Sequence, residues 1–145
     1  MRTTRTFPVP RNRLFQAWTS PDELKKWWQL GYGWKLTVVE MDLRVGGQYR
    51  IGLDSAKGDA KHHVTGTFRQ VTVPERLVYT WTAGDQNMRG EESIVTVEFH
   101  DKGSSSELIL THDLLVTKQE HESTYEGWLM VLDGLRRMIE SEAHT

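Results

Sequence analysis

Histidines and carboxylates are the side chains that could carry out chemistry in this chain, because the sequence contains no cysteine. His112 and His121 would lie near one another if a C-terminal helix covers a sheet, and His62 and His63 could join them. No pair follows the HxxxH or HExxH spacing that places two metal ligands on one helix face. We therefore predict no metal and no cofactor, and a zinc or iron site stays an alternative.

Acid–base catalysis would require a histidine or a carboxylate that faces a pocket. Strand alternation turns His112 inward, and it turns Asp113 on the same strand and Glu98 on the preceding strand toward solvent. No Ser-His-Asp arrangement or carboxylate pair is visible among the remaining candidates, which are Glu40, Asp42 and Glu126. The residues therefore predict a binding protein in which His112 orients a ligand, and an enzyme with His112 as its base is the alternative.

A long amphipathic pattern from Gln119 to Glu142 must position these groups. Its apolar residues recur at spacings of three and four, which predicts a helix with one buried face. The members of this stripe are Thr124, Trp128, Val131, Leu132, Leu135, Met138 and Ile139. A face of this width needs an apolar partner, and the rest of the chain must supply it.

The upstream chain reads as strands, with two short helices after the first of them. Ser20 and Pro21 are typical of a helix start, so we expect helices at Arg11–Thr19 and Pro21–Trp28. Alternating runs bounded by Gly, Pro and Asp predict the strands. These are Thr3–Val9, Leu36–Leu43, Gln48–Leu53, His62–Val73, Leu77–Trp81, Ser93–His100 and Glu107–Asp113. The prediction is one α+β domain over residues 1–145, in which a curved antiparallel sheet of about six to seven strands wraps around the C-terminal helix.

Five segments in this order carry a resemblance to a known family. They are FPVPRNRLFQAWTSPDELKKWW from Phe7, the Gly46–Gly47 turn, GTFRQVTVPERLVYTW from Gly66, LILTH from Leu108 and GWLMVLDGL from Gly127. Together they resemble the family named after the activator of heat shock protein 90 ATPase, which belongs to the START-like (SRPBCC, helix-grip) superfamily. The resemblance implies a deep pocket between the sheet and the C-terminal helix, which holds hydrophobic ligands in the wider superfamily. It also implies chaperone contact as an alternative function.

We predict that inward-facing residues of the sheet and helix line this pocket. Trp28 and Trp34 are candidate lids, and the alternative is that Trp27, Trp28 and Trp34 form an apolar plug that seats the short helices on the sheet. The alternative is a fully packed helix–sheet interface with no pocket, because each buried large side chain contributes ~1.5–3 kcal/mol to stability. The predicted lining residues are Tyr49, Ile51, Phe68, Tyr79, Trp81, Val97, Phe99, Leu110, His112, Trp128, Leu132 and Leu135.

Charge and hydropathy limit the partners. The formal net charge is −2 and both signs are interspersed, which gives no basis for nucleic-acid binding. No apolar run reaches the ~18 residues of a membrane span, so we expect no membrane insertion and a cytoplasmic location. The expected partner is a small hydrophobic or amphipathic ligand, with a homodimer left open.

Overall fold

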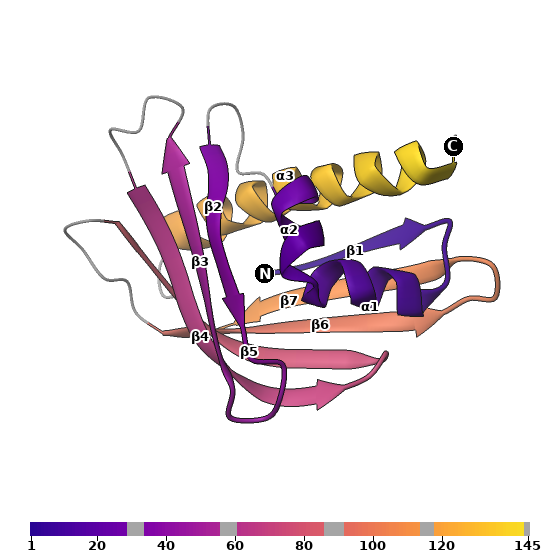
Figure 1. Ribbon diagram of the computed structural model, residues 1–145, viewed down its shortest axis with the longest axis horizontal. Helices are drawn as coiled ribbons and strands as arrows, with labels where there is room; N and C mark the ends of the chain where they lie inside the picture. Colours follow the sequence, from indigo (N-terminus) through magenta and orange to yellow (C-terminus); the bar gives the residue numbers. More distant parts are fainter. Residues whose placement is uncertain (29–33, 56–60, 86–91, 114–117, 144–145) are drawn as a thin grey trace.

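The computed structural model describes residues 1–28, 34–55, 61–85, 92–113 and 118–143. Seven antiparallel strands form a curved sheet in the order β1-β7-β6-β5-β4-β3-β2. One long helix, α3, lies along the sheet, and two short helices, α1 and α2, cover one end of it (Figure 1). The predicted α+β helix-grip architecture is therefore confirmed.

The elements follow the expected order along the chain. The first strand and the three helices are β1 (Arg2–Phe7), α1 (Arg11–Thr19), α2 (Pro21–Trp27) and α3 (Lys118–Ala143). The remaining strands are β2 (Trp34–Met41), β3 (Gln48–Ser55), β4 (Lys61–Thr72), β5 (Arg76–Asp85), β6 (Ser93–Asp101) and β7 (Ser106–Asp113). Strand β5 runs past the predicted end at Trp81, and β2 ends before the predicted Leu43 because Arg44 and Gly47 already form a turn with a positive φ of 85° at Gly46.

Local signals explain where the short helices begin. The Ser20 hydroxyl accepts a hydrogen bond from the Glu23 N–H, and Pro21 occupies the first turn of α2. Asp22 and Glu23 complement the helix dipole there. The capping prediction from the sequence is confirmed, and it sets the angle at which α2 leaves α1.

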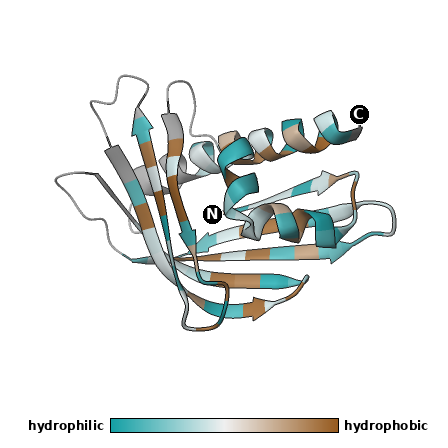
Figure 2. Cartoon of the chain, viewed as in Figure 1, coloured by the Kyte–Doolittle hydropathy of each residue, from teal (hydrophilic) through white to brown (hydrophobic). Residues whose placement is uncertain are grey.

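The apolar stripe of α3 is buried against the sheet and the short helices. Trp128, Val131, Leu132, Leu135 and Ile139 are each 3% exposed or less. Apolar positions, brown in Figure 2, occur on both the sheet and the helices, and the buried ones form one core cluster. This face supplies the partner that the helix pattern required.

Gly134 allows α2 to touch α3 directly. A Cβ at this position would lie 2.0 Å from the Trp27 carbonyl oxygen, which is far inside contact distance. The end of α2 is therefore seated on the backbone of α3, and Trp27 is fully buried there with its Nε1–H donated to Ala17 O at 2.9 Å. Trp27 therefore belongs to the packed contact between the short helices and α3.

Candidate functional site

An apolar cavity lies between the short helices and strands β2–β5. Its volume is about 20 Å³, which is room for about one water molecule. Among the described residues, none from α3 contributes to its wall. The lining residues are Trp18, Thr19, Leu24, Trp28, Met41, Tyr49, Ile51, Phe68, Leu77, Tyr79 and Trp81.

Aromatic rings fill the space beneath α3. The Trp128 ring centroid lies 6.2 Å from Trp18, 5.4 Å from Trp28 and 5.1 Å from Trp81. These four rings come from α1, the end of α2, β5 and α3, and only Trp81 is partly exposed. The helix–sheet interface around Trp128 is thus packed, and the cavity lies to one side of it.

The structure divides the predicted lining into two groups. Tyr49, Ile51, Phe68, Tyr79 and Trp81 line the cavity together with the candidate lid Trp28. The other predicted residues are buried in the same core outside the cavity wall, and they are Val97, Phe99, Leu110, His112, Trp128, Leu132 and Leu135. The side chain of the second candidate lid, Trp34, lies outside the described residues.

Sequence reasoning missed several lining residues. Leu77 alternates with Tyr79 and Trp81 along β5, so strand parity could have identified it. Trp18 and Leu24 face the core from α1 and α2, and helical spacing does not indicate which core residues border a gap. Thr19 and Met41 complete the missed set.

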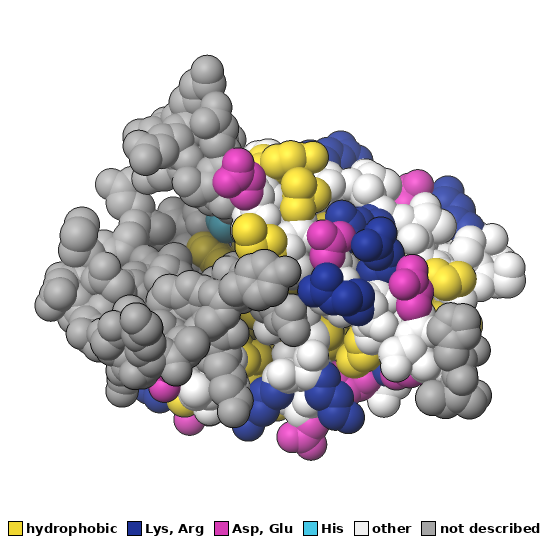
Figure 3. Space-filling view, turned by 90° about the horizontal axis from the view of Figure 1, so that it is seen from above, with side chains coloured by type: hydrophobic (Ala, Val, Ile, Leu, Met, Phe, Trp, Pro, Cys, Tyr) yellow, Lys and Arg dark blue, Asp and Glu magenta, His cyan; other side chains and the backbone are white. Residues whose placement is uncertain are grey.

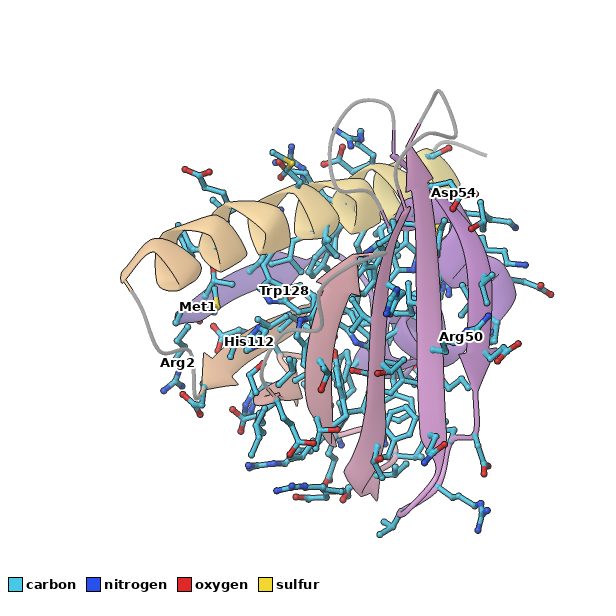
Figure 4. All side chains as sticks on the ribbon, turned by 90° about the vertical axis from the view of Figure 1, so that its left-hand side faces the viewer. Met1, Arg2, Arg50, Asp54, His112 and Trp128 are labelled. Carbon is cyan, nitrogen blue, oxygen red and sulfur yellow. The ribbon has the colours of Figure 1, made fainter. Side chains whose placement is uncertain are left out.

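His112 is the centre of a buried hydrogen-bond chain. Trp128 Nε1–H donates to His112 Nδ1 at 3.0 Å, and His112 Nε2 lies 2.7 Å from Ser93 Oγ. The Ser93 hydroxyl donates to Trp81 O at 3.1 Å. Figure 4 shows Trp128 reaching down from α3 toward His112 on β7. The chain joins α3, β7, β6 and β5, and Ser93 is the member that sequence reasoning missed.

The direction of these hydrogen bonds assigns the tautomer of His112. An indole N–H can only donate, so Nδ1 must accept, and the proton of the neutral ring then sits on Nε2. Nε2–H donates to Ser93 Oγ, whose own proton is directed to Trp81 O. In this arrangement His112 has no lone pair with which to take a proton from Ser93, so the pair is not arranged as a nucleophile and its base.

The histidines do not assemble a metal site among the described residues. No group of three His, Asp or Glu side chains with metal-binding proximity occurs there. His63 is exposed on β4, whereas His112 is buried on β7. The side chains of His62 and His121 lie outside the described residues, so the four-histidine alternative is not tested.

Most polar groups of the cavity wall are already hydrogen-bonded. The Tyr49 hydroxyl donates to Thr80 O at 2.5 Å, and Trp18 Nε1–H donates to the Tyr79 hydroxyl at 3.3 Å. Burial raises the pKa of both phenols above the usual value, so both are neutral. Trp28 Nε1 is the exception, because it is buried and has no hydrogen-bond partner.

A larger hollow of about 350 Å³ lies on the outer face of the sheet. Side chains that alternate with the core-facing ones form most of its wall, and Arg50 among them lies far from Trp128 and His112 (Figure 4). The lining is Glu40, Gln48, Tyr49, Arg50, Thr65, Gly66, Thr67, Thr80, Thr82 and Glu92. This polar wall is suited to water, whereas the inner cavity is suited to an apolar group.

Charged side chains tie the three helices together at the surface. Arg13 on α1 contacts Glu23 on α2 at 2.6 Å and also pairs with Glu142 on α3. Hydrogen bonds to Glu142 and then Glu23 raise the pKa of Arg13. Figure 3, which looks down on the α3 side, shows basic and acidic side chains next to one another.

Comparison with known proteins now places this geometry in a family. The family model for the activator of Hsp90 ATPase homolog 1-like proteins matches residues 8–140 of this chain. The chain belongs to this family. Its membership agrees with the helix-grip fold and with the START-like resemblance of the sequence. No curated protein matches the chain.

Several solved structures share this fold over nearly the whole chain. An AHSA1 protein from Silicibacter pomeroyi is 26% identical, with 98% of each chain covered and a TM-score of 0.84. A protein from Chromobacterium violaceum is 24% identical with a TM-score of 0.81, covering 97% of this chain and 96% of its own. An AHSA1-like protein from Aeromonas hydrophila, solved by NMR, is 22% identical with a TM-score of 0.75, covering 99% and 94%.

In this member of the activator of Hsp90 ATPase homolog 1-like family, the described site is built for contact with apolar groups. The described residues of the cavity wall include no charged side chain, and the buried histidine is held as a hydrogen-bond relay. No helix in the described part of the chain is long and apolar enough to cross a membrane.

Proposed function

We propose that this chain binds a small hydrophobic or amphipathic molecule in the cavity between α1–α2 and strands β2–β5. The supporting observation is the cavity wall itself, in which tryptophan, tyrosine and phenylalanine rings from the helices and the sheet surround a gap without a charged group. Small-molecule sites are concave and mostly apolar, with few polar groups, and this wall has that character.

The cavity has to widen to admit a ligand. Leaving about 20 Å³ empty costs only about 0.5 kcal/mol at ~24 cal/mol per Å³, so the closed form is stable without a ligand. A ligand larger than water must therefore separate rings that now touch, such as Trp28 and Trp81, whose centroids are 6.1 Å apart.

Trp28 is the side chain that we assign to the lid. Three of the buried polar rings in the wall, Trp18, Tyr49 and Tyr79, take part in hydrogen bonds, whereas Trp28 takes part in none. It also follows the last residue of α2, where its N–H bonds to Leu24 O at 2.9 Å. Moving the Trp28 side chain breaks no side-chain hydrogen bond. Among the four buried polar rings of the wall, Trp28 is therefore the one whose displacement requires the least free energy.

Native mass spectrometry and thermal shift against a library of lipids and polyketide-like molecules test this function. A ligand that binds only the folded chain must raise its melting temperature, by linkage. Met41→Trp should fill the mouth of the cavity and remove the shift. Val39→Trp is the matched control, because Val39 is also partly buried on β2 but does not line the cavity. The absence of any bound mass and any thermal shift across the library would refute the proposal.

Chaperone contact is the second candidate, and the family match favours it, because the family description names an activator of Hsp90 ATPase. It predicts a saturable complex with Hsp90 and a change in the rate of ATP hydrolysis. A flat titration monitored by both complex formation and ATP turnover would remove this candidate.

A further inference from the structure

The cavity wall contains a hydrogen-bond donor that has nothing to bind. Trp28 is 5% exposed, and its Nε1 is the one buried side-chain nitrogen or oxygen in the described part of the chain without a partner. Buried polar groups are nearly always hydrogen-bonded, so an orphan of this kind calls for an explanation. Its position in the wall of the proposed binding cavity suggests that the missing partner is supplied by the ligand.

Tyr79 offers a second donor to the same space. Its hydroxyl oxygen accepts from Trp18 Nε1–H at 3.3 Å, but its proton is donated to no described residue. A tyrosine hydroxyl both donates and accepts, so this proton is still available. Tyr79 comes from β5 and Trp28 from the end of α2, and both line the cavity.

Two further hydroxyl groups of the wall are already hydrogen-bonded to backbone carbonyls. The Thr19 hydroxyl donates to Phe15 O at 2.8 Å, and the Tyr49 hydroxyl donates to Thr80 O. No lysine, arginine or histidine belongs to the described lining, so a buried anion would find no counter-charge. A ligand that only donates hydrogen bonds would also leave Trp28 Nε1 unpaired.

We propose that the ligand is a neutral, largely apolar molecule with a carbonyl-type acceptor, to which Trp28 Nε1–H and the Tyr79 hydroxyl donate. This inference rests on the proposed function and specifies its ligand class. Ketones, esters and quinones fit the class, whereas carboxylates and plain hydrocarbons do not. Trp28 then closes over the ligand as a lid and gains the partner that it lacks in the free protein.

Three probes with one ring system test the class: 2-acetylnaphthalene, 2-ethylnaphthalene and 2-naphthoate. Their affinities are measured by titration of the full chain, followed through the indole N–H signals in ¹H–¹⁵N NMR spectra. One net hydrogen bond should make the ketone bind about 5–10-fold more tightly than the hydrocarbon. The carboxylate should bind most weakly, and the Trp28 indole proton should shift downfield with the ketone alone.

Trp28→Phe separates the N–H from the ring. It should reduce the preference for the ketone over the hydrocarbon in part, because the Tyr79 hydroxyl still donates, and it should leave hydrocarbon binding nearly unchanged, because it keeps an aromatic lid. Tyr79→Phe should reduce the same preference in part. The ratio of two ligands on one variant is insensitive to a general loss of fold, which affects both equally.

The outcomes separate this inference from the function on which it rests. Equal binding of ketone and hydrocarbon, unchanged by Trp28→Phe, would overturn the ligand class while the apolar site stands. That result would indicate that the Trp28 N–H is directed at the face of a neighbouring aromatic ring. Trp128 is such a ring, because the planes of the Trp28 and Trp128 rings lie at 70° to one another. Binding of none of the three probes would count against the proposed function and the ligand class together.

Discussion

Trp128 Nε1 and His112 Nδ1 lie 3.0 Å apart, and this hydrogen bond joins α3 to β7 inside an apolar core. Because the indole can only donate, the contact determines which ring nitrogen of His112 carries the proton. The proton on His112 Nε2 makes this nitrogen a donor to Ser93 Oγ. The Ser93 hydroxyl in turn donates to the Trp81 carbonyl oxygen. Removal of any member therefore breaks at least one buried hydrogen bond of this chain.

Ser93→Ala should lower the free energy of unfolding by about 1–3 kcal/mol, because it removes a buried hydrogen bond of His112 Nε2 and the one that Ser93 donates to Trp81 O. Urea unfolding measures the change. Ser104→Ala, in the exposed turn between β6 and β7, is the matched control and should change stability by less than about 0.5 kcal/mol. Equal effects of the two substitutions would contradict the relay. The ¹⁵N shifts of His112 at neutral pH should report the Nε2–H tautomer.

Gly134→Ala should destabilise the fold by about 1–3 kcal/mol through overpacking, because its Cβ would collide with the Trp27 carbonyl oxygen. In an unconstrained helix the same change would stabilise the helix by about 1 kcal/mol. The sign of the change in stability therefore shows whether Gly134 is in close contact with α2. Thermal unfolding provides the measurement. Ser141→Ala, exposed on α3, should be neutral or slightly stabilising.

Arg13→Gln should lower stability by about 1 kcal/mol at low salt, since it removes the ion pairs that link α1 to α2 and α3. The loss should shrink in 1 M NaCl, where exposed charges are screened beyond ~3 Å. Arg44→Gln serves as the control, because the Arg44 side chain is 72% exposed and its ion pair among the described residues is with Asp42, two residues away. A salt-independent loss would assign the role of Arg13 to packing of its aliphatic stem.

Stability should fall as the pH rises above about 10, the usual pKa of a phenol. Burial raises the pKa of Tyr49 and Tyr79, so the folded state keeps both protons where the unfolded state loses them. Their contribution is therefore complete below pH ~10 and is lost at higher pH. Urea unfolding at pH 8 and pH 10.5 should show a smaller decline in the Tyr49→Phe, Tyr79→Phe double variant. Tyr125→Phe, at a 41% exposed position, should retain the decline of the parent chain.

Much of the fold follows from local pattern. The stripe from Trp128 to Ile139 predicted α3 and its buried face, and Ser20–Pro21 predicted the start of α2. Strand alternation placed His112 inward and Asp113 outward, as the structure shows. These features are readable because helix and strand periods are properties of neighbouring residues.

The sequence by itself therefore determined the order of elements, the faces that become buried and the family. The tertiary structure decided where space remains between those faces, and it placed the cavity beside α2 with Trp128 packed outside its wall. A cavity is the small difference between the volume that the curved sheet encloses and the volume of the rings that α1, the end of α2 and strands β3, β4 and β5 contribute. The helix and strand periods of the sequence do not predict this difference in volume. They also do not predict that Ser93 contacts His112, or that the N–H of Trp28 is unpaired.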